Sequence, residues 1–142
     1  MQLGVTLVLQ NNTNELLTIE ACDVVVGGWV VEQEPRREDV VVKQGSGKWA
    51  TVGEDRTMAY ISIGSTKGNI SVQWDIVLGD TYGPTGLLPQ ITAPTKLDVI
   101  CKLNRAEASF PVLILTLYPG NKNDGYAYGE VKDVAIIEEL YH

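Results

Sequence analysis

The sequence predicts an all-β domain built as a β-sandwich, with a β-trefoil as the alternative. Short β-branched runs alternate with turn residues along all 142 residues, a pattern typical of strands rather than helices. The 14 glycines indicate many turns. A chain of this length is expected to form one domain and to bury about two thirds of its unfolded surface. We therefore expect residues 1–142 to fold as a single all-β domain.

The expected strands of the first half follow in chain order. Gly4–Gln10 and Glu15–Glu20 are separated by an Asn-rich turn and are expected to pair as a hairpin. Asp23–Val31 contains Gly27-Gly28, which indicates a bulge or a close approach of another backbone. The valine run of Asp39–Lys43 suits a strand that is buried on both faces. Three further strands are expected at Lys48–Val52, Thr57–Ile63 and Asn69–Leu78.

One of these strands has an especially clear alternation of apolar and polar residues. Ile70, Val72, Trp74 and Ile76 share one face, while the residues between them are mostly polar. A tryptophan aligned with aliphatic residues is expected in the core, so we predict that Trp74 is buried.

The second half contains an irregular stretch followed by more strands. Gly79–Pro94 is dense in glycine and proline, which predicts a long ordered loop, and such loops often carry function. Gly64–Gly68 is expected to be a hairpin turn rather than a phosphate-binding loop. Lys96–Leu103 and Pro111–Tyr118 are expected to be core strands. Tyr126–Tyr141 fits helical or strand spacing, and we favour strand.

Charge and composition exclude several classes of function. With 18 acidic against 11 basic residues the formal charge is −7, which disfavours nucleic acids and anionic lipids. Zwitterionic or neutral lipids and sugars remain as ligands. The only histidine is His142, at the end of the chain, so we expect no histidine-based catalysis. A carboxylate-based glycosidase stays open, because the separation of two carboxylates is spatial.

The cysteines and the start of the chain indicate neither a metal site nor an export signal. Cys22 and Cys101 match no metal-binding spacing and are expected as small core residues, with a disulfide as the alternative. We expect no metal or cofactor. No apolar run approaches the ~20 residues needed to span a bilayer, and no signal-peptide pattern follows Met1. The expected location is cytoplasmic, or secreted without a classical signal peptide.

Aromatic side chains are the candidate ligand contacts. An exposed ring can stack on the face of a sugar or lie at the level of lipid headgroups. The candidate ligand-binding residues are Trp29, Trp49, Tyr82, Tyr126 and Tyr128. Tyr82 lies within the Gly79–Pro94 loop, so we expect this loop to form part of a recognition surface.

Several short motifs occur in a particular order along the chain. They are Asn11-Asn12-Thr13 with Leu16, Gly27-Gly28-Trp29, Pro35, Gly64–Gly68, and Ile70–Asp75 running into Gly79 and Tyr82. Taken together, these motifs resemble the aegerolysin pattern, from Gly4 to about Gly86. Aegerolysins are small acidic β-sandwich proteins of fungi and bacteria that bind particular membrane lipids, often sphingolipids. Some act with a larger pore-forming partner, and some bacterial members are halves of insecticidal two-component toxins.

The resemblance implies a non-catalytic membrane-lipid-binding module that acts as the small component of a two-part pore-forming toxin. The sequence departs from the family after Asp75, where Ile76–Asp80 stands in place of the usual Asn-Pro step. The alternative function is a lectin-like protein that binds a glycan.

Overall fold

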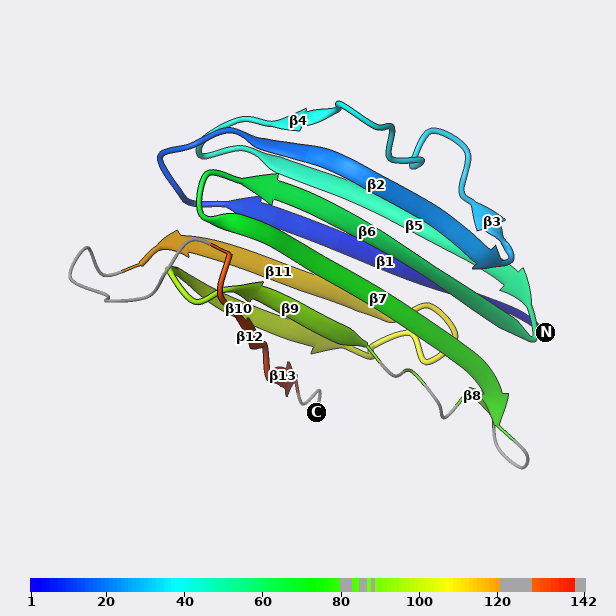
Figure 1. The fold of residues 1–142 in the computed structure, drawn as a ribbon. Coiled ribbons are helices and arrows are strands. Elements are labelled where there is room, and N and C mark those ends of the chain that lie inside the picture. Colours follow the sequence, from blue (N-terminus) through cyan, green and yellow to red (C-terminus); the bar gives the residue numbers. More distant parts are fainter. Residues whose placement is uncertain (80–82, 85–86, 88, 121–128, 140–142) are drawn as a thin grey trace.

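The structure is a computed structural model that describes residues 1–79, 83–84, 87, 89–120 and 129–139. Two β-sheets pack face to face as a sandwich (Figure 1). The expected all-β sandwich is therefore confirmed, and the trefoil alternative is wrong. None of the described residues forms a helix long and apolar enough to cross a membrane.

The first sheet, sheet A, has six strands and mixed direction. In spatial order they are β13 (Ile136–Glu138), β10 (Leu97–Asn104), β11 (Val112–Pro119), β1 (Gln2–Asn11), β5 (Ser46–Glu54) and β3 (Gly28–Trp29). β1 is antiparallel to β5 but parallel to β11, and β10 is parallel to β13. The N-terminal strand thus lies inside the sheet, held on both sides by strands distant in sequence.

The second sheet, sheet B, has seven strands, and its paired strands are antiparallel. In spatial order they are β12 (Val131–Asp133), β9 (Gln90–Pro94), β7 (Gly68–Gly79), β6 (Arg56–Ser65), β2 (Leu17–Val26) and β4 (Val40–Val41), with β8 (Gly83–Pro84) paired to β7. β6 and β7 form the hairpin that was expected around Gly64–Gly68.

The core fills the space between the sheets and is built from alternate residues of each strand. Leu3, Val5, Leu7 and Leu9 of β1 and Ile70, Val72, Trp74 and Ile76 of β7 are all buried. The predicted burial of Trp74 is therefore confirmed, with 1% of its surface exposed. Its indole Nε1 donates a hydrogen bond of 2.9 Å to Oγ1 of Thr51 on β5, which links the two sheets inside the core. Cys101 is buried, Cys22 is half-buried, and both are free thiols.

Two expectations about strand pairing are wrong. β1 and β2 lie in different sheets and form no hairpin, because buried residues of the connection turn the chain across the end of the sandwich. The expected strand Asp23–Val31 is divided at Gly27, after which β3 joins sheet A. Gly27 has a φ of 92°, and a Cβ there would lie 2.2 Å from the carbonyl oxygen of Val52. The close backbone approach expected at this glycine is confirmed.

Two further expectations need correction. The run Asp39–Lys43 forms only the two-residue edge strand β4, and Val40 and Val42 are exposed, because an edge strand buries only its inward side. The expected loop Gly79–Pro94 contains two strands: β8 pairs with the end of β7, and the last five residues are β9, which pairs with β7 and β12. Backbone pairing with two neighbours overrides the local turn signals there.

The two open sides of the sandwich are each crossed by a short segment. One runs from β3 in sheet A to β4 in sheet B, and the other from β12 in sheet B to β13 in sheet A (Figure 1). We call them the straps. Val134 and Ile136 of the second strap pack against the core. The preference for strand within Tyr126–Tyr141 is thus confirmed for the described strands β12 and β13.

Candidate functional site

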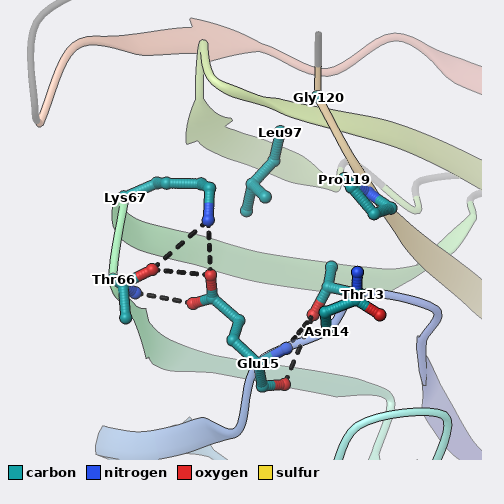
Figure 2. Close-up of a pocket in the computed structure, with 8 residues that line it drawn as sticks. All are labelled: Thr13, Asn14, Glu15, Thr66, Lys67, Leu97, Pro119 and Gly120. Atoms are coloured by element: carbon teal, nitrogen blue, oxygen red, sulfur yellow. Dashed lines mark hydrogen bonds and ion pairs between the residues drawn. The ribbon is translucent and has the colours of Figure 1, made fainter. Parts of the chain in front are cut away.

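A cavity of about 400 Å³ opens where several turns meet at one end of the sandwich (Figure 2). We call it the end pocket. Its walls come from the β1–β2 connection, the β6–β7 turn, the start of β10 and the end of β11. The lining residues are Thr13, Asn14, Glu15, Thr66, Lys67, Leu97, Pro119 and Gly120.

The wall formed by the β1–β2 connection is fixed by Asn11, which is completely buried. Its Nδ2 donates hydrogen bonds to the carbonyl oxygens of Glu15 (2.8 Å), Val41 (3.1 Å) and Val42 (3.1 Å). Its Oδ1 accepts hydrogen bonds from the amide (3.1 Å) and hydroxyl (2.5 Å) groups of Thr13. A side-chain amide that uses both donors and its acceptor in this way holds the turn in one conformation.

The opposite wall is the tight turn between β6 and β7. Ser65 Oγ donates a hydrogen bond of 2.6 Å to the carbonyl oxygen of Gly68, and the Lys67 amide donates one of 3.2 Å to Ser65 Oγ. Gly68 has a φ of 135°, in a region that side-chain-bearing residues rarely adopt. This turn places Thr66 and Lys67 over the pocket.

Glu15 joins the two walls (Figure 2). One carboxylate oxygen accepts a hydrogen bond of 2.6 Å from the Thr66 amide. The other accepts hydrogen bonds from the Thr66 hydroxyl (2.6 Å) and the Lys67 ammonium group (2.7 Å). The Glu15 side chain is 13% exposed and that of Lys67 is 35% exposed. The pair is therefore partly screened from solvent but still reachable from the pocket.

The environment of Glu15 favours its charged form. Burial acts against the charge, but the hydrogen bonds from Lys67 and Thr66 and the positive charge of Lys67 outweigh burial. The pKa of Glu15 consequently lies below 4.5, its ordinary value. A carboxylate with a lowered pKa is poorly matched to proton transfer near neutral pH. The arrangement is better suited to holding a ligand than to acid–base chemistry.

The pocket thus combines one anion, one cation and an apolar wall. A lysine ammonium group has three N–H donors, and the described contacts of Lys67 use two of them, on Glu15 and Thr66. The third is available for an anionic group of a ligand. Leu97 and Pro119 supply the apolar part of the lining. Among the residues that the structure describes, no group of three or more side chains is placed to hold a metal ion.

The predicted contact residues do not gather at this pocket. Trp29 is half-buried on β3, where its ring meets that of Trp74 edge-on, with centroids 6.2 Å apart and planes at 81°. Trp49 is only 7% exposed and belongs to the core, so its ring faces the space between the two sheets instead of solvent. Tyr82, Tyr126 and Tyr128 lie outside the described residues.

Glu15, Thr66 and Lys67 were not among the residues singled out from the sequence. Glu15 is 51 residues from Thr66 and 52 from Lys67, and each belongs to an ordinary polar turn. The only available signal was the lysine at the tip of the predicted Gly64–Gly68 turn, next to a threonine. No local pattern indicates that the β1–β2 connection lies beside that turn.

Comparison with known proteins adds no assignment. No protein-family model matches the chain, and no curated protein is significantly similar to it in sequence.

Proposed function

We propose that this protein is a non-catalytic membrane-lipid-binding module that acts as the small component of a two-part pore-forming toxin. The observation that carries the proposal is the end pocket, where Glu15 and Lys67 present opposite charges beside an apolar wall. The sandwich fold, which is the fold that the aegerolysin-like motifs imply, adds support. The proposal assigns recognition of the membrane to this chain and formation of the pore to a larger partner.

The chemistry of the pocket fits a zwitterionic lipid headgroup. Such a headgroup carries an anionic phosphate and a cationic ammonium group a few bonds apart. The remaining N–H of Lys67 can donate to a phosphate oxygen, and the Glu15 carboxylate can attract the positive charge of the ammonium group. The chain's formal charge of −7 opposes adsorption to anionic lipid surfaces. Charge and site geometry therefore favour the same class of lipid.

Vesicle flotation tests the assignment. We expect the protein to float with vesicles of phosphatidylcholine or sphingomyelin and to stay behind with vesicles of phosphatidylglycerol. Lys67→Met removes the ammonium group and should abolish flotation. Lys102→Met removes an exposed lysine from β10, far from the pocket lining, and should leave flotation unchanged. Equal binding by both variants, or failure of the parent protein to bind any vesicle, would contradict the proposal.

Dye release tests the second half of the proposal. Vesicles that bind the protein should keep an encapsulated dye when the protein is added alone, and should lose it only when a larger pore-forming partner is also present. Leakage caused by this chain alone would show that it forms pores without a partner, and the two-part assignment would then be wrong.

A further inference from the structure

Among the residues that the structure describes, the outward face of sheet B is largely polar, apart from the exposed Val25 and Val77, and carries one exposed aromatic ring. Its central row crosses four neighbouring strands: Asp23 of β2 pairs with Tyr60 of β6, Tyr60 with Gln73 of β7, and Gln73 with Gln90 of β9. All four side chains are exposed, and Tyr60 is 37% exposed. We call these residues the sheet B row. Residues paired across adjacent strands lie side by side, so the row is continuous.

The polar groups of the row are free to bind a ligand. Within the described part of the chain, no hydrogen bond engages the side chains of Tyr60, Gln73 or Gln90. Asp23 uses one carboxylate oxygen, which accepts a hydrogen bond of 2.9 Å from the Val24 amide, and the other oxygen remains available. The row therefore offers carboxamide donors and acceptors, a carboxylate and a phenol hydroxyl along one line.

Two shallow cavities flank the end of the row. One of about 140 Å³ is lined by Met58, Gln73, Trp74, Asp75 and Gln90. Another, of about 340 Å³, is lined by Pro89, Gln90, Ile91, Thr92, Asp133 and Val134. Gln90 belongs to both, so a ligand with repeating units can occupy the two cavities while the amide of Gln90 contacts it in between.

The charges of this face determine what kind of ligand it accepts. Arg56 is the only lysine or arginine in β2, β6, β7 and β9, and both its Nε and one terminal nitrogen are bound to the Asp75 carboxylate at 3.0 and 2.9 Å. Glu20 and Asp23 add exposed negative charge to β2. Phosphate, sulfate and other anionic ligands are therefore disfavoured, while uncharged hydroxyl groups can pair with carboxylates and amides.

From this arrangement we infer that the outward face of sheet B binds a neutral oligosaccharide. The Tyr60 ring stacks on the apolar face of one sugar unit, and Asp23, Gln73 and Gln90 bind the hydroxyl groups of that unit and its neighbours. Tyrosine suits this role because a large, rigid ring loses little conformational freedom on binding. The site is distinct from the end pocket and independent of the lipid-binding proposal.

Retention on immobilised sugars tests the inference. The probes are neutral tetrasaccharides of glucose, mannose, galactose and N-acetylglucosamine, with a heparin tetrasaccharide as the anionic comparison. We expect retention on at least one neutral surface, no retention on heparin, and little change between low and high salt. Tyr60→Ala should weaken binding by about tenfold, since loss of an aromatic stacking contact of about 1.4 kcal/mol corresponds to that factor.

Tyr118→Ala is the matched control. Tyr118 is 39% exposed, almost as much as Tyr60, but lies on β11 in the other sheet. It should keep the parent affinity, and thermal unfolding should show that both variants are folded. The inference is overturned if the parent binds no neutral tetrasaccharide, if folded Tyr60→Ala binds as tightly as the parent, or if Tyr118→Ala loses as much affinity. Retention that disappears at high salt would indicate an ionic contact instead of recognition of uncharged hydroxyl groups and would overturn it as well.

Discussion

Replacing Asn11 by alanine should destabilise the protein strongly although the residue lies in a turn. The substitution removes three hydrogen bonds that Nδ2 donates and two that Oδ1 accepts. Because Asn11 is fully buried, water cannot replace these bonds without entering the end of the sandwich. The side chain joins the β1–β2 connection to residues Val41 and Val42, so its loss should also loosen one wall of the end pocket.

The expected magnitude follows from the partners that remain. A buried hydrogen bond contributes about 0.5–1.5 kcal/mol, so five would give roughly 2.5–7.5 kcal/mol. Two of the carbonyl acceptors keep another donor: Gly45 donates to Val42 at 2.9 Å, and the Thr13 hydroxyl donates to Glu15 at 3.3 Å. We therefore expect Asn11→Ala to lower the free energy of unfolding by about 2–4 kcal/mol, a large part of the total for a small domain.

Urea unfolding followed by tryptophan fluorescence measures this loss. The control is Asn12→Ala. Asn12 is the adjacent asparagine, and its side chain forms no hydrogen bond within the described part of the chain. It should change the free energy of unfolding by less than about 0.5 kcal/mol. If the two variants have equal unfolding midpoints, the Asn11 network does not stabilise the fold and the reasoning fails.

Three further results are expected. Trp74→Ala should lower the free energy of unfolding by roughly 3–5 kcal/mol. A double-mutant cycle of Trp74→Phe with Thr51→Val should show a coupling energy of about 0.5–3 kcal/mol, because the two side chains share a hydrogen bond. A coupling energy of zero would mean that this bond is not formed in solution. The pKa of Glu15 is lowered in the folded protein, so its contribution to stability is present above the unfolded value of 4.5 and is lost as the pH falls through the folded value. The free energy of unfolding of Glu15→Gln should therefore differ from that of the parent at pH 7 and match it in strong acid. A constant difference across this range would contradict the lowered pKa. Burial raises the pKa of the Cys101 thiol to about 12. A thiol-alkylating reagent at pH 8, with mass spectrometry as the readout, should therefore modify Cys101 only after the protein unfolds. Rapid modification of the folded protein would show that the reagent reaches this thiol in the native state.

The all-β fold and the core position of Trp74 could be predicted because a period of two is a local property of a strand. The pairing of strands could not. The parallel contact between β1 and β11 joins Thr6 to Val112, and no local pattern of either strand indicates the other. The same limitation explains why β1 and β2, separated by one short turn, were wrongly expected to pair. A turn leads to a neighbouring strand in either sheet, and the buried Asn11 directs this one across the sandwich.

Trp49 and the end pocket show a second limit of sequence reasoning. Trp49 lies in the short expected strand Lys48–Val52, which has mixed residues, so its neighbours did not indicate which face it takes. In the structure, its ring packs beside Gly47, where a Cβ would lie 2.6 Å from a ring carbon. The pair formed by Glu15 and Lys67 depends on the meeting of two turns that only the completed sandwich brings together.

The two straps restrict how this protein can assemble with others. The outermost strand at each of the four sheet edges, β3, β4, β12 or β13, has only two or three residues. Strand addition requires a longer row of unpaired backbone groups than such strands provide. We therefore expect a partner of the described part of the chain to recognise side chains on the sheet faces or at the end pocket rather than to extend these four strands. Its affinity should respond to single surface substitutions, and short β-forming peptides should not compete with it.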